Sequence, residues 1–328
     1  MSWWRRRLRA LIFGGAIVLV VIAALFFIPL PFYIFGPGAA VDLNGLMSVP
    51  EHSPPPGNLY LTDVTVMPGR PAFYAAAKTL PGFEIVPRSY VAPPDKSERA
   101  INQEWIDAMK ESQTVAQVVA ERAAGYKVGA HEDITIVSTV KGLPAAGCFR
   151  PGDRILKMEG KEPSDSDFVS QTTSKRPVGS TFHLSILRKG TVVPVACKTV
   201  MYKGKPRFGM TVIPITRAYS LPVHVEFHVR DINGSSAGLM FALQIYRSLT
   251  GTVLANGAKI AGTGVLQANG RVTPVGGVKE KVEAARHQGA SVFLVPEHDY
   301  KDIKDVTGIR IIPVKSFQDA LNKLRALT

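Results

Sequence analysis

The feature that most constrains this 328-residue chain is a strand-like run that turns, through glycine and serine, into a helix-like run. Apolar residues alternate with polar ones over residues 223–229, the period of a half-buried strand. Apolar residues recur at helical spacing over 239–249, and Asn-Gly-Ser-Ser-Ala-Gly lies between the two runs at 233–238. A serine at such a turn has an exposed hydroxyl, and the start of a helix favours negative charge. Ser236 is therefore a candidate nucleophile.

Taken alone, the serine motif also has a purely structural interpretation, because Gly/Ser-rich turns precede many helices and serine is a good N-cap residue. A second motif lies downstream at residues 272–285. Its Gly276 and Gly277 allow close backbone approach. Lys279 begins a helix whose apolar face carries Val278, Val282 and Ala285. The helix dipole and burial lower the pKa of a lysine placed there, so that its neutral amine can accept a proton from a serine.

The two motifs together resemble the Ser-Lys dyad of the Lon-type proteases, whose pattern is Gly-Pro-Ser-Ala-Gly followed by Gly-Gly-apolar-Lys-Glu-Lys. Lys279 lies 43 residues after Ser236, which fits the spacing expected in that family. The resemblance implies that Ser236 is the nucleophile and Lys279 its general base. It also implies that Thr263 hydrogen-bonds the lysine amine, and that backbone N–H groups of residues 234–236 stabilise an oxyanion.

The serine motif departs from the family pattern at two positions. Ser235 replaces the proline before the serine, and Asn233 replaces the acidic residue two positions earlier. Because two serines are adjacent, the nucleophile is ambiguous. Ser236 is favoured because the following Ala-Gly and the distance to Lys279 align with it, which leaves Gly234 and Ser235 as supporting turn residues.

The N-terminal region contains a stretch without charge, residues 11–35, directly after an arginine-rich start. About 20 apolar residues span a bilayer, whereas a signal-peptide core has about 7–15. We therefore expect residues 1–36 to form a cytoplasmic basic tip and a transmembrane anchor that contacts lipid through residues 11–35. The positive-inside rule places the remainder outside the cytoplasm. A cleaved signal peptide is the alternative, although residues 38–40 make a poor cleavage site. A buried core helix is disfavoured by the arginines.

Residues 37–126 are expected to combine a linker with elements that pack on the protease domain. The segment 36–57 is rich in proline and glycine, as linkers are. Residues 58–66 alternate as a strand, and a Lon-type protease fold begins with such a strand. Residues 104–126 carry an amphipathic pattern that predicts a helix.

Residues 127–203 resemble a PDZ domain, on the strand-like runs 134–137 and 181–190 and the Pro-Gly-Asp turn that ends at Asp153. Asp153 is expected to accept a backbone hydrogen bond in that turn. Such domains bind extended peptides by adding a strand to a sheet edge, and residues 127–130 are a candidate carboxylate-binding loop. A structural spacer is the alternative. Cys148 and Cys197 lie in this region, and either a disulfide or two buried thiols is compatible with the sequence.

The expected fold class is α+β, with an N-terminal transmembrane helix, a mainly β PDZ-like domain and a Lon-type proteolytic α+β domain at 204–328. The resemblance is to the PDZ-containing Lon-type proteins of Gram-positive bacteria. The expected function is that of a membrane-anchored, extracytoplasmic, ATP-independent serine endopeptidase. Its expected partners are unfolded or flexible segments of exported or membrane proteins. The family resemblance also implies a homo-oligomer, a hexamer.

Several classes of protein are disfavoured by the sequence. It contains no P-loop motif and no His-Glu-x-x-His, and its seven histidines are scattered, so no cofactor and no metal are expected. The net charge is +13, but the charges form no basic run interleaved with aromatic residues, which argues against nucleic-acid binding. Two other functions stay open: a catalytically weak peptide-binding scaffold tethered to a membrane, and an assembly factor that cleaves only itself.

Overall fold

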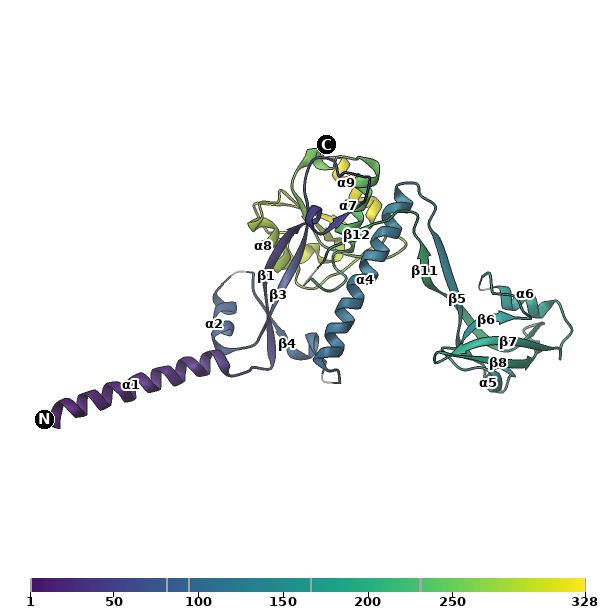
Figure 1. The fold of residues 1–328 in the computed structure, drawn as a ribbon, viewed down its shortest axis with the longest axis horizontal. Coiled ribbons are helices and arrows are strands. Elements are labelled where there is room, and N and C mark those ends of the chain that lie inside the picture. The colour runs from purple at the N-terminus through teal and green to yellow at the C-terminus, as the bar shows by residue number, and fades with distance from the viewer. Residues whose placement is uncertain (1, 81, 94, 166, 230–231, 328) are drawn as a thin grey trace. The chain divides into compact units, whose positions relative to one another are not determined.

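The structure is a computed structural model that describes residues 2–80, 82–93, 95–165, 167–229 and 232–327 (Figure 1). The chain divides into two compact units. Unit 1 comprises residues 1–127 and 221–328, and unit 2 comprises residues 128–220. Unit 2 is therefore an insertion in unit 1, because the segments before and after it in the sequence form one compact unit.

Unit 1 contains a six-stranded mixed sheet in the spatial order β17-β16-β13-β3-β1-β4. The strands are β1 (Phe32–Asp42), β3 (Leu59–Pro68), β4 (Glu84–Pro87), β13 (Ile260–Gly262), β16 (Val292–Pro296) and β17 (Arg310–Val314). Strands β3, β13, β16 and β17 are parallel, whereas β1 runs antiparallel to β3 and β4. The strand predicted at 58–66 is thus a central strand of the sheet, although it lies far upstream of the serine motif.

Helices cover both faces of this sheet, because successive side chains of a strand point to opposite sides. Leu59 and Leu61 pack into the core with α4 (Glu98–Ala123), α7 (Gly238–Thr250) and α9 (Phe317–Arg325). Tyr60, between them, packs into a second core with α8 (Val278–His287). In Figure 1, α7 and α9 lie together on one side of β1 and β3, and α8 lies on the other. The candidates in the turn that leads into α7 and on α8 are thus carried by helices from opposite layers.

The remaining elements of unit 1 range from two-residue strands to the 26-residue helix α1. They are α1 (Ser2–Phe27), η1 (Leu43–Gly45), β2 (Met47–Ser48), α2 (Pro71–Thr79), α3 (Arg88–Val91), β12 (Glu226–Phe227), η2 (Ala255–Gly257), β14 (Val265–Leu266), β15 (Val272–Thr273) and η3 (Glu297–Asp302). The strand predicted over 223–229 is reduced to β12, which pairs with β2. The alternation itself is right, because Val223, Val225, Phe227 and Val229 pack against the core.

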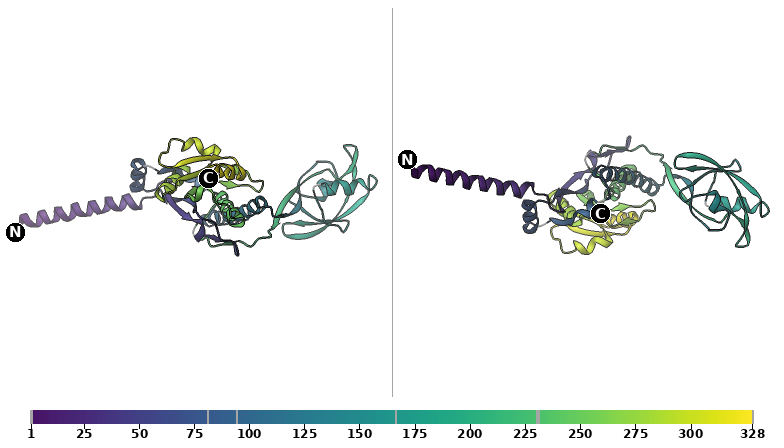
Figure 2. Two further views of the ribbon diagram at one scale, coloured as in Figure 1. Left: turned by 90° about the horizontal axis from the view of Figure 1, so that it is seen from above. Right: turned by 90° about the horizontal axis from the view of Figure 1, so that it is seen from below.

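The segment predicted as a membrane anchor, residues 11–35, is not a single helix in the structure. Helix α1, the purple helix in both views of Figure 2, ends at Phe27, and Phe32 begins β1. Residues Phe32 to Phe35 pair with Pro87 to Glu84 of β4, so the end of the charge-free stretch belongs to the sheet. Among the described residues, none of the helices has both the length and the apolar character needed to cross a membrane.

The segment predicted as a linker is also more ordered than its composition indicates. Its first residues continue β1 as far as Asp42. The proline-rich end is fixed by Arg247 of α7, whose guanidinium donates hydrogen bonds to the carbonyls of Pro55 (2.6 Å) and Gly57 (2.7 Å). Only 2% of Arg247 is exposed, so these carbonyls give a buried cation its hydrogen-bond partners.

Unit 2 is an antiparallel sheet in the order β11-β5-β6-β7-β8. Its elements are β5 (Gly129–Thr139), α5 (Ala145–Cys148), β6 (Arg154–Met158), α6 (Phe168–Ser174), β7 (Thr181–Arg188), β8 (Thr191–Lys198), β9 (Val200–Tyr202), β10 (Lys205–Arg207) and β11 (Met210–Ser220). The core contains Ile136, Ile155, Phe182 and Ile186. Because β11 pairs with β5 along its whole length, this unit ends at Ser220 rather than at the predicted residue 203.

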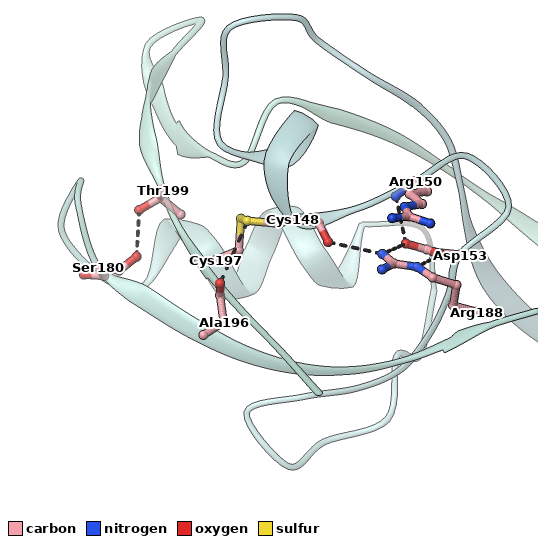
Figure 3. Close-up of a disulfide and its surroundings, with 8 residues drawn as sticks. All are labelled: Cys148, Arg150, Asp153, Ser180, Arg188, Ala196, Cys197 and Thr199. Carbon is pink, nitrogen blue, oxygen red and sulfur yellow. Dashed lines mark hydrogen bonds and ion pairs between the residues drawn. A yellow bond between two sulfur atoms is a disulfide. The ribbon is translucent and has the colours of Figure 1, made fainter. Parts of the chain in front are cut away.

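Two features fix the loop between β5 and β6 (Figure 3). Cys148 and Cys197 form a disulfide, which resolves the alternatives left open by the sequence. Asp153, 2% exposed, accepts the backbone N–H of Arg150 at 2.8 Å, as predicted for the Pro-Gly-Asp turn. It also receives two hydrogen bonds from Arg188, at 2.8 and 2.6 Å, and these chiefly lower the pKa of its carboxyl.

Candidate active site

Ser236 lies in the turn that leads into α7, and backbone contacts fix its position. The turn passes through Gly234, whose φ of +96° is readily adopted by glycine. The carbonyl of Ser236 accepts the N–H of Gly264 at 2.8 Å and the hydroxyl of Thr263 at 3.2 Å. These contacts join the serine turn to the segment after β13, while the hydroxyl of Ser236 is directed elsewhere.

The hydroxyl of Ser236 faces a lysine, Lys281 of α8. The Lys281 Nζ lies 3.0 Å from Ser236 Oγ, and only 5% of the lysine is exposed. Burial lowers the pKa of Lys281 from 10.5 to about 8, although the charges of Asp63, Asp299 and Glu280 act to raise it. A substantial fraction of this amine is therefore neutral near pH 8 and has a lone pair for the serine proton.

Lys279, which the sequence predicted as the general base, lies elsewhere. It is exposed and lines a separate depression of about 300 Å³ with Gly82, Glu283, Asp302 and neighbouring residues of η3. The physical reason is the geometry of the helix: two residues differ by about 200° around its axis, so Lys279 and Lys281 cannot face the same side. The predicted Ser236–Lys279 pair is replaced in the structure by Ser236 and Lys281.

A signal for Lys281 was present in the sequence. The buried residues of α8 include Val278, Val282 and Ala285, at the spacing of one helix face. Lys281 is three residues after Val278 and four before Ala285, so it lies within that apolar face. Lys279 lies outside it. The spacing from the serine favours Lys279, whereas the helical periodicity favours Lys281, which is the lysine that the structure places beside Ser236.

Of the two glycines before α8, only Gly277 makes the predicted close approach, since a Cβ atom on Gly276 would meet only Tyr90 Oη at 3.9 Å. Gly277 has a φ of +66°, and a Cβ atom there would lie 2.5 Å from Cγ2 of Val64 on β3. Glycine therefore allows the start of α8 to approach the sheet closely. This approach brings the first turns of α8, and Lys281 with them, next to the strand whose residues line the same cleft.

The three supporting residues have structural partners that the sequence did not indicate. Thr263 is fully buried, and its hydroxyl contacts the Ser236 carbonyl rather than the lysine amine expected for it. Gly234 donates its N–H to the carbonyl of Trp105 at 3.0 Å, so this group is already used. The Ser235 carbonyl accepts the hydroxyl of Ser112 at 3.0 Å. Trp105 and Ser112 belong to α4, and their contacts with the serine turn were not predicted from the sequence.

Ser236 and Lys281 both line a cleft of about 500 Å³. Its walls come from five parts of unit 1: β1 and β3, helix α4, the serine turn, the segment around β14 and β15, and helix α8. Asp63 and Lys281 are the charged residues in the described lining, which otherwise includes apolar side chains: Phe35, Leu61, Val64, Val66, Trp105, Met109, Ile232, Val265 and Val275. An extended peptide with apolar side chains matches such a lining.

The described residues contain no group of three His, Cys, Asp or Glu side chains arranged to hold a metal ion. His224 and His228, on the polar face of the predicted strand, instead lie beside Glu226 at 3.5 and 3.9 Å. Neither is part of the described cleft lining. The chemistry that this cleft offers is a hydroxyl next to a buried amine.

Unit 2 has its own groove of about 330 Å³. It is lined by the beginning of β11, an edge strand, by α6, and by the cationic side chains of Lys203 and Arg207. The loop predicted to bind a carboxylate, residues 127–130, is not in the described lining of this groove. Residues 129 and 130 instead pair with the far end of β11.

Comparisons with known proteins match the part of the chain that contains Ser236 and Lys281. Residues 206–325 match the family model of the Lon protease (S16) C-terminal proteolytic domain. Lon protease 2 of Bacillus subtilis is 37% identical over 104 residues, which are 31% of this chain and 18% of that protein. Lon protease of Halothermothrix orenii is 40% identical over 101 residues, 31% of this chain and 12% of that protein.

This chain spans less than a fifth of the length of those two relatives. Among solved structures, the PDZ domain of an SdrC-like protein from Listeria innocua aligns with 24% of this chain and 92% of that chain. The identity is 23% and the TM-score 0.23. The match to the family model shows that residues 206–325, about the last third of the chain, are homologous to the proteolytic domain of Lon proteases, which are serine peptidases.

Proposed function

We propose that this protein is an ATP-independent serine endopeptidase in which Ser236 is the nucleophile and Lys281 the general base. The observation that carries the proposal is the 3.0 Å contact between Ser236 Oγ and the Nζ of a 5% exposed lysine. Burial that lowers the lysine pKa to about 8 supports it, because the base must be neutral to accept a proton. The homology of residues 206–325 to Lon proteolytic domains supports the same reaction class.

The reaction proceeds in two halves. Neutral Lys281 accepts the proton of Ser236 as the serine oxygen bonds to the carbonyl carbon of the scissile peptide. The tetrahedral intermediate collapses, the C–N bond breaks, and the lysine ammonium gives its proton to the leaving amine. Water, deprotonated by the same lysine, then hydrolyses the acyl-enzyme and regenerates both groups.

The oxyanion formed in each half needs hydrogen-bond donors. The N–H of Gly234 is bonded to Trp105, so it does not serve this role. The N–H groups of Ser235 and Ser236 have no acceptor among the described residues, and both residues line the cleft. We therefore narrow the predicted oxyanion site to these two groups, of which a well-placed one contributes about 3–4 kcal/mol.

The proposed substrates are unfolded or flexible segments. The cleft has a largely apolar lining, and the sequence has no P-loop with which to unfold a folded substrate. Origin of these segments in exported or membrane proteins, membrane attachment, an extracytoplasmic position and assembly into a hexamer stay predictions from the sequence. Residues 32–35 belong to β1 and are therefore not part of an anchor. Protease protection of the full chain in closed vesicles would test the location.

The test is cleavage of casein and of a fluorogenic peptide by the full chain, by Ser236→Ala and by Ser235→Ala. We expect Ser236→Ala to lose cleavage and Ser235→Ala to retain it. Activity that survives Ser236→Ala contradicts the proposal. Loss of self-cleavage alone would favour the assembly factor, and peptide binding without any cleavage by the unmodified chain would favour the scaffold.

A second function, capture of a peptide C-terminus by unit 2, is favoured by its groove. An edge strand such as β11 can pair with an added strand, and Lys203 and Arg207 supply cations for a terminal carboxylate. Fluorescence anisotropy would compare a peptide with a free carboxylate and the same peptide as its C-terminal amide. Equal affinities would contradict carboxylate recognition.

A further inference from the structure

Helix α4 contacts the serine turn at two consecutive residues. The carbonyl of Trp105 accepts the N–H of Gly234 at 3.0 Å. Two turns further along α4, the hydroxyl of Ser112 donates to the carbonyl of Ser235 at 3.0 Å. These bonds join residues that are more than 120 positions apart in the sequence, so the turn does not depend on its own local geometry alone.

The surroundings of Ser112 leave little room for movement. Only 5% of Ser112 is exposed. A Cβ atom on Gly238, the first residue of α7, would lie 2.9 Å from Ser112 Oγ and 3.1 Å from Cβ of Leu266. Helices α4 and α7 thus meet closely at this point, and the hydroxyl is held between the helix it belongs to and the turn it contacts.

The contact to Ser235 has a consequence for the next residue. A peptide unit is planar and trans, so the carbonyl of Ser235 and the N–H of Ser236 point in opposite directions. A hydrogen bond that holds the carbonyl toward Ser112 therefore holds the N–H of Ser236 away from Ser112. The N–H of Gly238 also reaches the Ser235 carbonyl, but at 3.4 Å, so Ser112 makes the shorter of the two hydrogen bonds to it. Without the Ser112 bond, the peptide unit is held only by this longer contact and can rotate, which turns the Ser236 N–H out of position. The carbonyl on the other side of Ser236 is fixed independently by Gly264 and Thr263.

We propose that Ser112 is a positioning residue: through the Ser235 carbonyl it orients the N–H of Ser236 toward the developing oxyanion. This inference rests on the proposed peptidase function. Ser112 touches neither the Ser236 hydroxyl nor Lys281 in the described contacts, so its effect is confined to the oxyanion site. Ser112 belongs to α4, which precedes unit 2 in the sequence, whereas the serine turn follows unit 2.

The experiment compares Ser112→Val with Ser112→Thr in the full chain, because the two side chains have the same shape and differ in the hydroxyl. We expect Ser112→Val to lower kcat by about 10- to 100-fold with KM within about threefold, less than the effect of deleting a whole donor. Ser112→Thr, which keeps the hydroxyl, should have a kcat close to that of the unmodified chain. Ser248→Ala, another buried helical serine, at 6% exposure, should leave kcat unchanged.

Two further readouts separate orientation of the oxyanion donor from general loosening of the fold. The affinity for a peptide aldehyde, whose serine adduct carries the oxyanion, should fall by the same factor as kcat/KM. The pH midpoint of kcat/KM should not move, because Lys281 is untouched. Equal kcat in the Thr and Val variants would overturn the proposal, as would a kcat loss with unchanged aldehyde affinity. Cleavage that persists in Ser236→Ala would instead overturn the peptidase function itself.

Discussion

Helix α8 borders two depressions, and a lysine lines each of them. Lys281 faces the cleft that contains Ser236, is 5% exposed and has a pKa lowered to about 8 by burial. Lys279, two residues earlier, is exposed beside Glu283, Asp302 and Asp305 in the other depression. The two residues share a helix and a chemical group but not an environment. In the proposed mechanism the base is therefore the lysine that is desolvated next to a hydroxyl, and not the lysine nearest the start of the helix.

The strongest test of this difference removes each amine in turn. Lys281→Met should lower peptide hydrolysis by about 100- to 10,000-fold, the usual contribution of a general base. Lys279→Met should change it by less than about twofold, because an exposed side chain outside the cleft is lost. Initial rates on a fluorogenic peptide measure both. A large loss in Lys279→Met with a small one in Lys281→Met would reverse the assignment.

The same two variants should differ in stability, in the opposite sense to activity. Because burial lowers the Lys281 pKa, the folded state holds its cation at a cost near pH 7. Lys281→Met is expected to raise the free energy of unfolding by about 1–3 kcal/mol, and Lys279→Met to change it by less than about 0.5 kcal/mol. Urea unfolding at pH 7 measures both. Destabilisation by Lys281→Met would show that the carboxylates near the amine outweigh its burial.

The pH dependence of acylation should follow Lys281 and not Lys279. A lysine with a pKa of about 8 is mostly protonated below that pH, so the acylation rate should rise about tenfold per pH unit there. The rate should level off above about pH 8. Stopped-flow acylation by an activated ester gives the profile. In Lys279→Met the midpoint should stay where it is, and a shift there would link the two depressions.

The smallest expected effect comes from Asp63, whose negative charge acts to raise the Lys281 pKa. Asp63→Asn should move the midpoint of the acylation profile to lower pH, by a fraction of a pH unit. Asp302→Asn, the matched change in the depression around Lys279, should leave the midpoint unchanged. A shift in the opposite direction would mean that the amide disturbs the burial of the lysine rather than its charge partners.

Much of the fold and part of the site were predictable because they depend on local periodicity. The turn at Ser236, helix α7, strand β3 and the close approach at Gly277 all follow from residues near one another in the sequence. Lys281 was predictable in principle from the apolar face of α8. The contacts of Ser112 and Trp105 were not, because no local pattern indicates which helix packs on the serine turn.

Two other errors have physical causes. The charge-free composition of residues 11–35 does not show where a helix ends and a strand begins, and the pairing of Phe32 to Phe35 with β4 decides this. The end of unit 2 depends on the pairing of β11 with β5 across the 70 residues of chain between the two strands. The disulfide likewise required knowledge of a distance, 6.0 Å between the Cα atoms of Cys148 and Cys197.

The pairing of Ser236 with Lys281 in catalysis is tested most directly by locating the acyl group and following its formation with pH. The full chain would react with a serine-directed acylating inhibitor over a pH series, with intact mass measurement and peptide mapping. We predict a single adduct on Ser236, with a rate that rises through an apparent pKa of about 8 and is lost in Lys281→Met. An adduct on Ser235, or an unchanged rate in Lys281→Met, would contradict the account.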